Sequence, residues 1–215
     1  MKKHTIIALM LLMGLAMPVL AQNNEKERVQ LARDRYAESL EHIATIREYE
    51  KDDIPAINYT TIVRKQNWPG SGMMTDKLEF FYNEIEDEFE PYPVGYSLLI
   101  IRRTYNIAAK EYFEEYVYDE DANPLFWYAI YGYKNNDNTY ASKTELRGYF
   151  YADGTLARTI SKVLDDNGEM KEYSLQDHEN EYSEMTYADV YASALSHFRD
   201  FKNVFDFLYH TEYLY

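Results

Sequence analysis

Cysteine is absent from this sequence of 215 residues, and glycine and proline are scarce, with 8 and 6 residues. A chain without cysteine has no disulfide, no thiol nucleophile and no cysteine-based zinc site. It also has no cysteine to carry the lipid of a lipoprotein. The folded protein must therefore be stable through packing alone.

Basic residues are also few, with 22 lysines and arginines against 37 aspartates and glutamates, and the formal net charge is −15. No run of basic residues is longer than two, as in the pair Arg102 and Arg103. Such a balance repels phosphate backbones and anionic membrane surfaces. We therefore expect no nucleic acid among the partners.

The longest apolar run lies at the N-terminus. A basic start at residues 2–4 precedes apolar residues 6–20, and the small residue Ala21 follows. This pattern is typical of a cleavable secretory signal. The run is shorter than the roughly 20 residues of a membrane span and is interrupted by Gly14 and Pro18. We expect cleavage after Ala21 and export to the periplasm or out of the cell.

Residues 22–215, which follow the signal peptide 1–21, are expected to form a single α+β domain that does not span a membrane. A long helix is predicted over 25–53, closed by Pro55, and an amphipathic helix over 187–209. Thr186 and Asp189 resemble a capping box at the start of the second helix. The stripes expected to face the core are Val29, Ala32, Tyr36, Leu40 and Ile43, and Tyr187, Val190, Ala194, Phe198, Phe201, Phe205 and Leu208.

Between the helices, the pattern changes to the period of strands. Turn signals such as Asp153-Gly154 and Asn167-Gly168 separate the apolar runs, and these pairs favour tight hairpins. Consecutive hairpins predict an antiparallel meander of about six to eight strands, with the C-terminal helix packed on the sheet. Residues 96–101 and 125–133 are apolar on both faces, so we expect central strands there. The predicted strands are 56–66, 76–85, 95–106, 110–119, 125–134, 144–152, 155–164 and possibly 169–175.

Several stretches carry a resemblance to a known group of proteins. They are Arg64-Lys65, Asn67-Trp68-Pro69-Gly70-Ser71-Gly72, Glu79-Phe80-Phe81-Tyr82, residues 102–109 and residues 112–119. Over residues 25–175 the chain resembles a family of small exported proteins of Gram-negative anaerobes. The resemblance implies export and a similar fold, and it brings no active site with it.

No stretch has the spacing of a known catalytic or metal site. Glu114 and Glu115 should point to opposite faces of a strand, and we expect acidic pairs to lie on solvated edges or loops. The acidic turns at 119–123 and 165–167 do not match a twelve-residue calcium loop. The histidines of the mature chain, His42, His178, His197 and His210, lack zinc-ligand spacing. We expect no catalytic residue, metal or cofactor to be identifiable from the sequence.

Aromatic residues are abundant, with 23 Tyr, 10 Phe and 2 Trp. Tyrosine joins an apolar ring to a hydroxyl that can stay in water, which suits binding surfaces. We therefore favour a non-enzymatic binding protein that uses an aromatic sheet face to contact a protein, a glycan or an apolar ligand. The residues proposed for this surface are Trp127, Tyr128, Tyr131, Tyr133, Tyr149 and Tyr151.

Two other functions are compatible with the sequence. A carrier of an apolar small molecule would need a pocket lined by Trp127, Phe198 and Phe201. A hydrolase acting on glycans or cell-wall material would need a cleft with two close carboxylates.

The expected cleavage of the signal peptide can be tested. When the full chain is expressed in a Gram-negative host, the exported protein should begin at Gln22, because Ala21 supplies the small residue at the cleavage point. Intact-mass spectrometry checks this. Replacing Ala21 with Leu should leave the leader attached, and an exported wild-type protein that still carries residues 1–21 would contradict the prediction.

Overall fold

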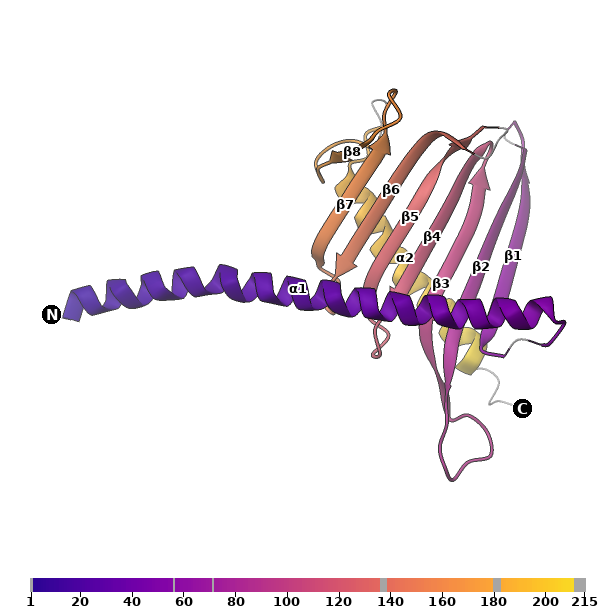
Figure 1. Ribbon diagram of the computed structural model, residues 1–215, viewed down its shortest axis with the longest axis horizontal. Helices are drawn as coiled ribbons and strands as arrows, with labels where there is room; N and C mark the ends of the chain where they lie inside the picture. Colours follow the sequence, from indigo (N-terminus) through magenta and orange to yellow (C-terminus); the bar gives the residue numbers. More distant parts are fainter. Residues whose placement is uncertain (1, 56, 71, 136–138, 180–182, 211–215) are drawn as a thin grey trace.

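The chain forms a helix, eight strands and a second helix, in that order (Figure 1). The computed structural model describes residues 2–55, 57–70, 72–135, 139–179 and 183–210, with side chains from residue 24 to residue 209. The α+β class and the element order predicted from the sequence are confirmed. The elements are α1 (Lys2–Lys51), β1 (Tyr59–Trp68), β2 (Gly72–Ile85), β3 (Gly95–Ile107), β4 (Lys110–Tyr118), β5 (Pro124–Lys134), β6 (Tyr140–Phe150), β7 (Leu156–Leu164), β8 (Met170–Tyr173) and α2 (Tyr187–His210).

The strands form one sheet in which each strand pairs antiparallel with the next along the chain, from β1 to β8. The predicted meander is therefore confirmed. Gly154 and Gly168 have positive φ angles of 84° and 80° in the turns before β7 and β8. Glycine adopts this left-handed region without strain, which is why the Asp-Gly and Asn-Gly pairs mark these hairpins.

Helix α1 begins at Lys2, well before the predicted start at residue 25, and ends at Lys51. Residues 2–21 are rich in Leu, Met and Ala, which all favour helix. Asp53 has a positive φ of 53° just after the helix, and Pro55 follows it. Within the part of the chain that the structure describes, no helix is both long enough and apolar enough to cross a membrane.

The buried side of α1 differs from the predicted stripe at one position. Val29, Ala32 and Ile43 are buried as expected, but Leu40 is 37% exposed and its neighbour Ser39 is buried. The hydroxyl of Ser39 donates a hydrogen bond to the Arg35 carbonyl at 2.8 Å, which satisfies it without a partner on the sheet. A small residue therefore lies against the sheet where the periodicity predicts a leucine.

Helix α2 follows its prediction more closely. Tyr187, Ala194 and Phe198 are buried against the sheet, as are Phe201 and Phe205. At its start, the Thr186 amide donates to Asp189 Oδ2 at 2.8 Å, and the Asp189 amide donates to Thr186 Oγ1 at 3.3 Å. These reciprocal bonds confirm the capping box.

The two helices cover opposite faces of the sheet and create two apolar cores. On the α1 side, Phe81 and Phe126 pack with residues of that helix, and on the α2 side Phe80 and Trp127 pack with the other helix. Neighbouring residues of one strand therefore enter different cores. The prediction that 96–101 and 125–133 lie in central strands is confirmed, because β3 and β5 are inner strands of the sheet with residues in both cores.

Gly132 provides a test of this packing. A Cβ at residue 132 would lie 1.8 Å from the carbonyl oxygen of Ser142 on β6, so alanine there must separate two paired strands. We expect Gly132→Ala to lower the free energy of unfolding by about 3 kcal/mol. Gly95→Ala is the matched control, because its Cβ would meet no heavy atom closer than 3.5 Å. Urea unfolding measures both variants, and equal stability of the two would contradict the close approach.

Candidate functional site

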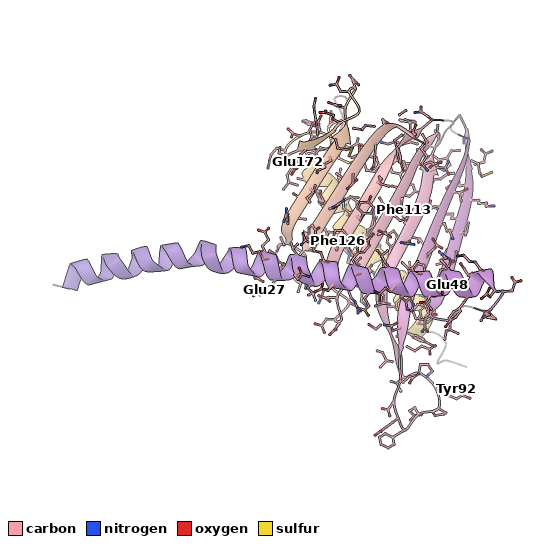
Figure 2. The ribbon with its side chains drawn as sticks, in the orientation of Figure 1. Glu27, Glu48, Tyr92, Phe113, Phe126 and Glu172 are labelled. Carbon is pink, nitrogen blue, oxygen red and sulfur yellow. The ribbon has the colours of Figure 1, made fainter. Side chains whose placement is uncertain are left out.

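Helix α1 covers only one end of its face of the sheet (Figure 1). In Figure 2, Phe126 lies beside the helix, whereas Phe113 stands on the part of the face that the helix leaves open. The cross-strand neighbours beside the helix are Phe81, Ile100, Val117, Phe126 and Tyr149. Two residues further along each strand, the next row on this face is Glu79, Arg102, Glu115, Tyr128 and Arg147.

The charged row is held by ion pairs and by polar groups of α1. Glu115 is only 1% exposed, and its two oxygens accept hydrogen bonds from Arg102 Nε at 2.7 Å and from the Tyr36 hydroxyl at 2.6 Å. Burial and the adjacent Glu115 charge raise the pKa of Tyr36 well above its usual range. Tyr36 therefore stays protonated and donates.

Glu79 shows the same arrangement nearer the edge of the sheet. Lys77 Nζ and the Tyr59 hydroxyl donate to it at 2.6 and 2.8 Å, and Arg47 of α1 also contacts it. Burial alone would raise the pKa of Glu79, but these donors outweigh it and hold the pKa below its usual value.

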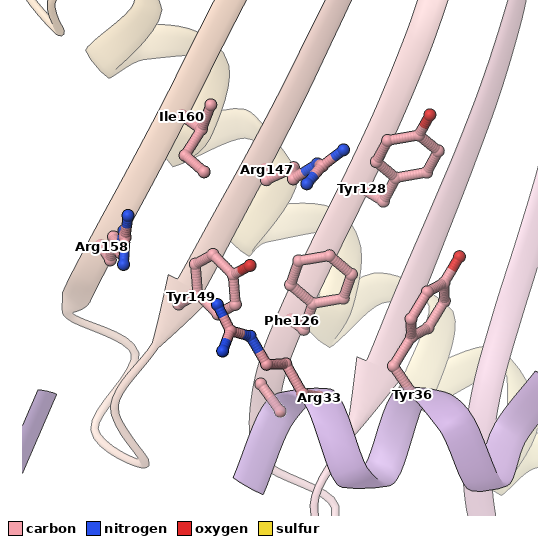
Figure 3. A pocket seen from close by; sticks show the side chains of 9 residues that line it. Arg33, Tyr36, Phe126, Tyr128, Arg147, Tyr149, Arg158 and Ile160 are labelled. Atoms are coloured by element: carbon pink, nitrogen blue, oxygen red, sulfur yellow. The ribbon is translucent and has the colours of Figure 1, made fainter. Parts of the chain in front are cut away.

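On the β5–β7 side of the helix, the two rows form a pocket of about 390 Å³ (Figure 3). We call it the arginine–tyrosine pocket. Its walls come from one helix and three strands, so all of its side chains stand on regular backbone. The lining residues are Ala32, Arg33, Tyr36, Phe126, Tyr128, Arg147, Tyr149, Arg158 and Ile160.

The base of the pocket is aromatic. The ring centre of Phe126 lies 5.0 Å from that of Tyr149 and 5.3 Å from that of Tyr36, with the planes tilted in both pairs. Phe126 and Tyr149 are buried, whereas Tyr36 and Tyr128 are half-buried. Burial, followed by the charge of Glu145, raises the pKa of Tyr128, so its hydroxyl is neutral and can donate to a ligand.

Three guanidinium groups border this base (Figure 3). Arg147 Nη2 pairs with Glu145 at 2.6 Å, and its guanidinium carbon lies 5.8 Å from the Tyr128 ring centre. The guanidinium groups of Arg33 and Arg158 form neither an ion pair nor a hydrogen bond with any other residue that the structure describes. The pocket therefore joins aromatic rings to positive charge.

The opposite face holds a second polar cluster, under α2. Arg103 Nε and Nη2 each lie 3.0 Å from an oxygen of Asp76, and Arg103 Nη1 lies 3.6 Å from Glu114. Glu114 also accepts a hydrogen bond from the Tyr116 hydroxyl at 2.7 Å. Arg102 therefore pairs with a carboxylate on the α1 face of the sheet, whereas Arg103 pairs with carboxylates on the α2 face.

A cavity of about 230 Å³ lies beside this second cluster and is lined by Glu114, His197, Trp127 and Tyr131 among others. Trp127 is 2% exposed, and its Nε1–H has no acceptor among the described residues. Burial, and next the Glu179 charge, raise the pKa of Tyr131 far above its usual range. This cavity is smaller than the arginine–tyrosine pocket, and its lining includes the charged residues Lys110, Glu114 and Glu179.

The acidic pair predicted to be solvated is instead buried. Glu114 and Glu115 do point to opposite faces, as expected, but each is engaged by an arginine and by tyrosine hydroxyls. The physical reason is their central position in the sheet, where a lone carboxylate would be costly and a cross-strand arginine offsets that cost. The prediction of a solvated edge was wrong for these two residues.

The six residues predicted to form one contact surface lie in several places. Tyr128 and Tyr149 line the arginine–tyrosine pocket, whereas Trp127 and Tyr131 line the cavity on the α2 side. Tyr131, which we expected to face outward, is only 6% exposed.

The last two predicted residues lie outside both pockets. Tyr133 is 50% exposed near the end of β5, and Tyr151 lies in the turn after β6, where its amide donates to the Thr155 carbonyl at 2.8 Å. Strict alternation along β5 separates Trp127 and Tyr131 from Tyr128.

Sequence reasoning missed the arginines of the pocket. A signal for one was present, because Arg147 and Tyr149 are two residues apart in a strand and so share a face. Arg33 and Arg158 gave no such signal, since only helix docking and the β6–β7 register bring them to the same pocket.

The pocket expected for an apolar carrier is filled by side chains. Phe198 and Phe201 each pack edge to face on Tyr116, with ring centres 5.1 Å away, and Trp127 packs on Tyr191 at 5.5 Å. These rings belong to one buried cluster. The arrangement gives the carrier hypothesis no support at that place.

The acidic turn at 119–123 is explained by turn chemistry. Asp119 Oδ1 accepts hydrogen bonds from the amides of Asp121 and Asn123 at 3.2 and 2.8 Å, and Asp119 Oδ2 pairs with Arg28 at 3.1 Å. Among the residues that the structure describes, no group of three His, Asp or Glu side chains is arranged to hold a metal ion.

Comparisons with known proteins add no relative from which a function can be carried over. The sequence matches no family model, and neither the curated proteins nor the solved structures give a match.

His197 of α2 makes the stability of the α2 side of the sheet depend on pH. Burial lowers the pKa of His197, whose Nδ1 lies 3.1 Å from the Tyr116 hydroxyl, so the unfolded chain, with a pKa of about 6.5, binds the proton more readily. The stabilisation present above pH ~6.5 is then lost as the pH falls. We expect the stability advantage of wild type over His197→Asn to shrink between pH 7.5 and pH 5.5. Urea unfolding measures it, and a constant difference would refute the effect.

Proposed function

We propose that this chain is an exported, non-enzymatic binding protein whose ligand occupies the arginine–tyrosine pocket beside helix α1. Tyr128 and Tyr149 are its central contact residues, and Phe126 forms the base. Export by the leader at residues 1–21 is part of the proposal and places the pocket in the periplasm or outside the cell.

The observation that carries this proposal is a concave aromatic site of about 390 Å³ at the edge of the α1 cover. Pockets that hold small ligands usually have volumes of about 300 to 1,000 Å³ and are lined mainly by apolar and aromatic groups. Tyr36 and Tyr128 are half-buried there, and each leaves part of a ring available for contact. A ligand that covers these rings removes apolar surface from water, which is the main favourable contribution to binding.

The pocket is also rigid. Phe126, Trp127 and Tyr128 pair in register with Tyr149, Gly148 and Arg147 on the adjacent strand. Phe126 and Ala32 belong to one buried cluster that joins α1 to the sheet. Because the site exists before a ligand arrives, little conformational entropy is lost on binding.

Nuclear magnetic resonance titration of the ¹⁵N-labelled protein with phenol, indole and benzoate tests the proposal. We expect the largest amide shifts at Tyr128, Tyr149 and Ile160, because these residues line the pocket. Tyr128→Ala should weaken the best probe by about tenfold, since the ring supplies much of the contact area.

Tyr133→Ala is the matched control, because Tyr133 is an exposed tyrosine of the same strand outside the pocket. It should leave probe affinity unchanged. Far-ultraviolet circular dichroism verifies that both variants are folded. Shifts centred elsewhere, or equal losses in the two variants, would show that the pocket is not the binding site.

A further inference from the structure

We infer that the ligand of the arginine–tyrosine pocket is a small organic anion in which a carboxylate is attached to a ring. This inference depends on the proposed function and specifies its ligand class.

Most arginines of this chain already have a carboxylate partner. Acidic residues outnumber basic ones by 37 to 22, and every described arginine of α1 and of the sheet except Arg33 and Arg158 pairs with a carboxylate. Arg102 pairs with Glu115, Arg103 pairs with Asp76, and Arg47 pairs with Glu79. Arg33 and Arg158 line one pocket, yet neither forms an ion pair with a described residue. Within α1 and the sheet, they are the two described arginines without a carboxylate, and both are exposed at the border of the same cavity; Arg199 of α2 is the third described arginine without one.

The lining of the pocket contains three arginines and no acidic residue. Glu145 pairs with Arg147 from outside that lining. The net positive charge of the site therefore contrasts with the charge of −15 on the whole chain. The local field attracts an anion to the pocket, although the rest of the surface repels it.

Regular secondary structure holds the three arginines at this pocket. Arg158 lies opposite Tyr149 in the β6–β7 register, and Arg147 lies opposite Ile160. Arg33 follows Ala32, which is buried between α1 and the sheet. All three guanidinium groups are therefore attached to ordered backbone at the rim of the aromatic base (Figure 3).

The chemistry of these groups fits a ring that carries a carboxylate. A guanidinium presents parallel N–H groups that fit the two oxygens of a carboxylate. The half-buried rings of Tyr36 and Tyr128 offer apolar surface for the body of the ligand, beside the buried base formed by Phe126 and Tyr149. A volume of about 390 Å³ accommodates a ring with one or two substituents. The ligand therefore combines a ring with a carboxylate.

Isothermal titration calorimetry at low salt, with amide shifts to locate binding, tests this inference. The probes are benzoate, its neutral isostere benzamide, and glucuronate, which carries the carboxylate on a sugar ring. We expect a carboxylate probe to bind in the pocket at least about tenfold more tightly than benzamide, because a hydrogen bond to a charged group is stronger than one to a neutral group. Tighter binding of benzoate identifies an aromatic acid as the ligand type, and tighter binding of glucuronate identifies a sugar acid. Added salt should weaken either carboxylate.

Substitutions of the two unpaired arginines give the second part of the test. Arg158→Gln and Arg33→Gln should each remove most of the preference for the carboxylate, whereas Arg158→Lys should retain part of it. Arg199→Gln is the matched control, because it removes the same charge from an exposed arginine of α2 on the other side of the sheet. It should leave the preference intact.

The outcomes separate this inference from the proposed function. Equal binding of benzoate, glucuronate and benzamide in the pocket, unchanged in Arg158→Gln, would overturn the anion inference and leave the pocket as the binding site. Equal losses in Arg158→Gln and Arg199→Gln would also overturn it, because the effect would then be one of overall charge. Failure of all three probes to shift pocket amides would overturn the anion inference, and failure of phenol and indole as well would overturn the proposed function.

Discussion

The structure depends on a sheet whose central strands are apolar on both faces. Burying one large apolar side chain contributes about 1.5 to 3 kcal/mol, so leaving either face of β3 or β5 in water would cost more than a domain of this size can spare. The chain meets this constraint with one helix from each end, and each helix forms its own core with the sheet. On the α1 face, the charged row begins where the helix cover ends.

The charged residues of the sheet show this most clearly. On the α1 face, the row beside the helix is apolar and the next row begins with Glu79, Arg102 and Glu115. On the α2 face, Asp76, Arg103 and Glu114 form a corresponding group. Because side chains alternate along a strand, the consecutive residues Arg102 and Arg103 of β3 form their ion pairs on opposite faces of the sheet. The antiparallel register brings opposite charges close enough to offset the cost of their burial.

The arginine–tyrosine pocket lies at the boundary between the apolar row and the charged row. Phe126 and Tyr149 belong to the first row, and Tyr128 and Arg147 belong to the second. A site at such a boundary offers apolar contact and polar recognition together, which explains why tyrosine is so frequent in this part of the sheet. At the cavity on the α2 side, by contrast, the charges are already paired with one another, Arg103 with Glu114 and Lys110 with Glu179.

The sequence by itself determined the element order, the antiparallel meander, the capped C-terminal helix and the two-sided burial of the central strands. These features depend on local periodicity and on turn residues such as Gly154 and Gly168, which lie close together along the chain. Alternation within β5 also assigns Tyr128 and Tyr131 to opposite faces, although the abundance of tyrosine obscured that distinction.

Only the tertiary structure decided that Ser39 and not Leu40 faces the sheet, that Glu114 and Glu115 are paired and buried, and that Arg33 and Arg158 share a pocket. Each of these results depends on the docking of α1 or on the register between strands. Both are long-range interactions that no local pattern of residues specifies.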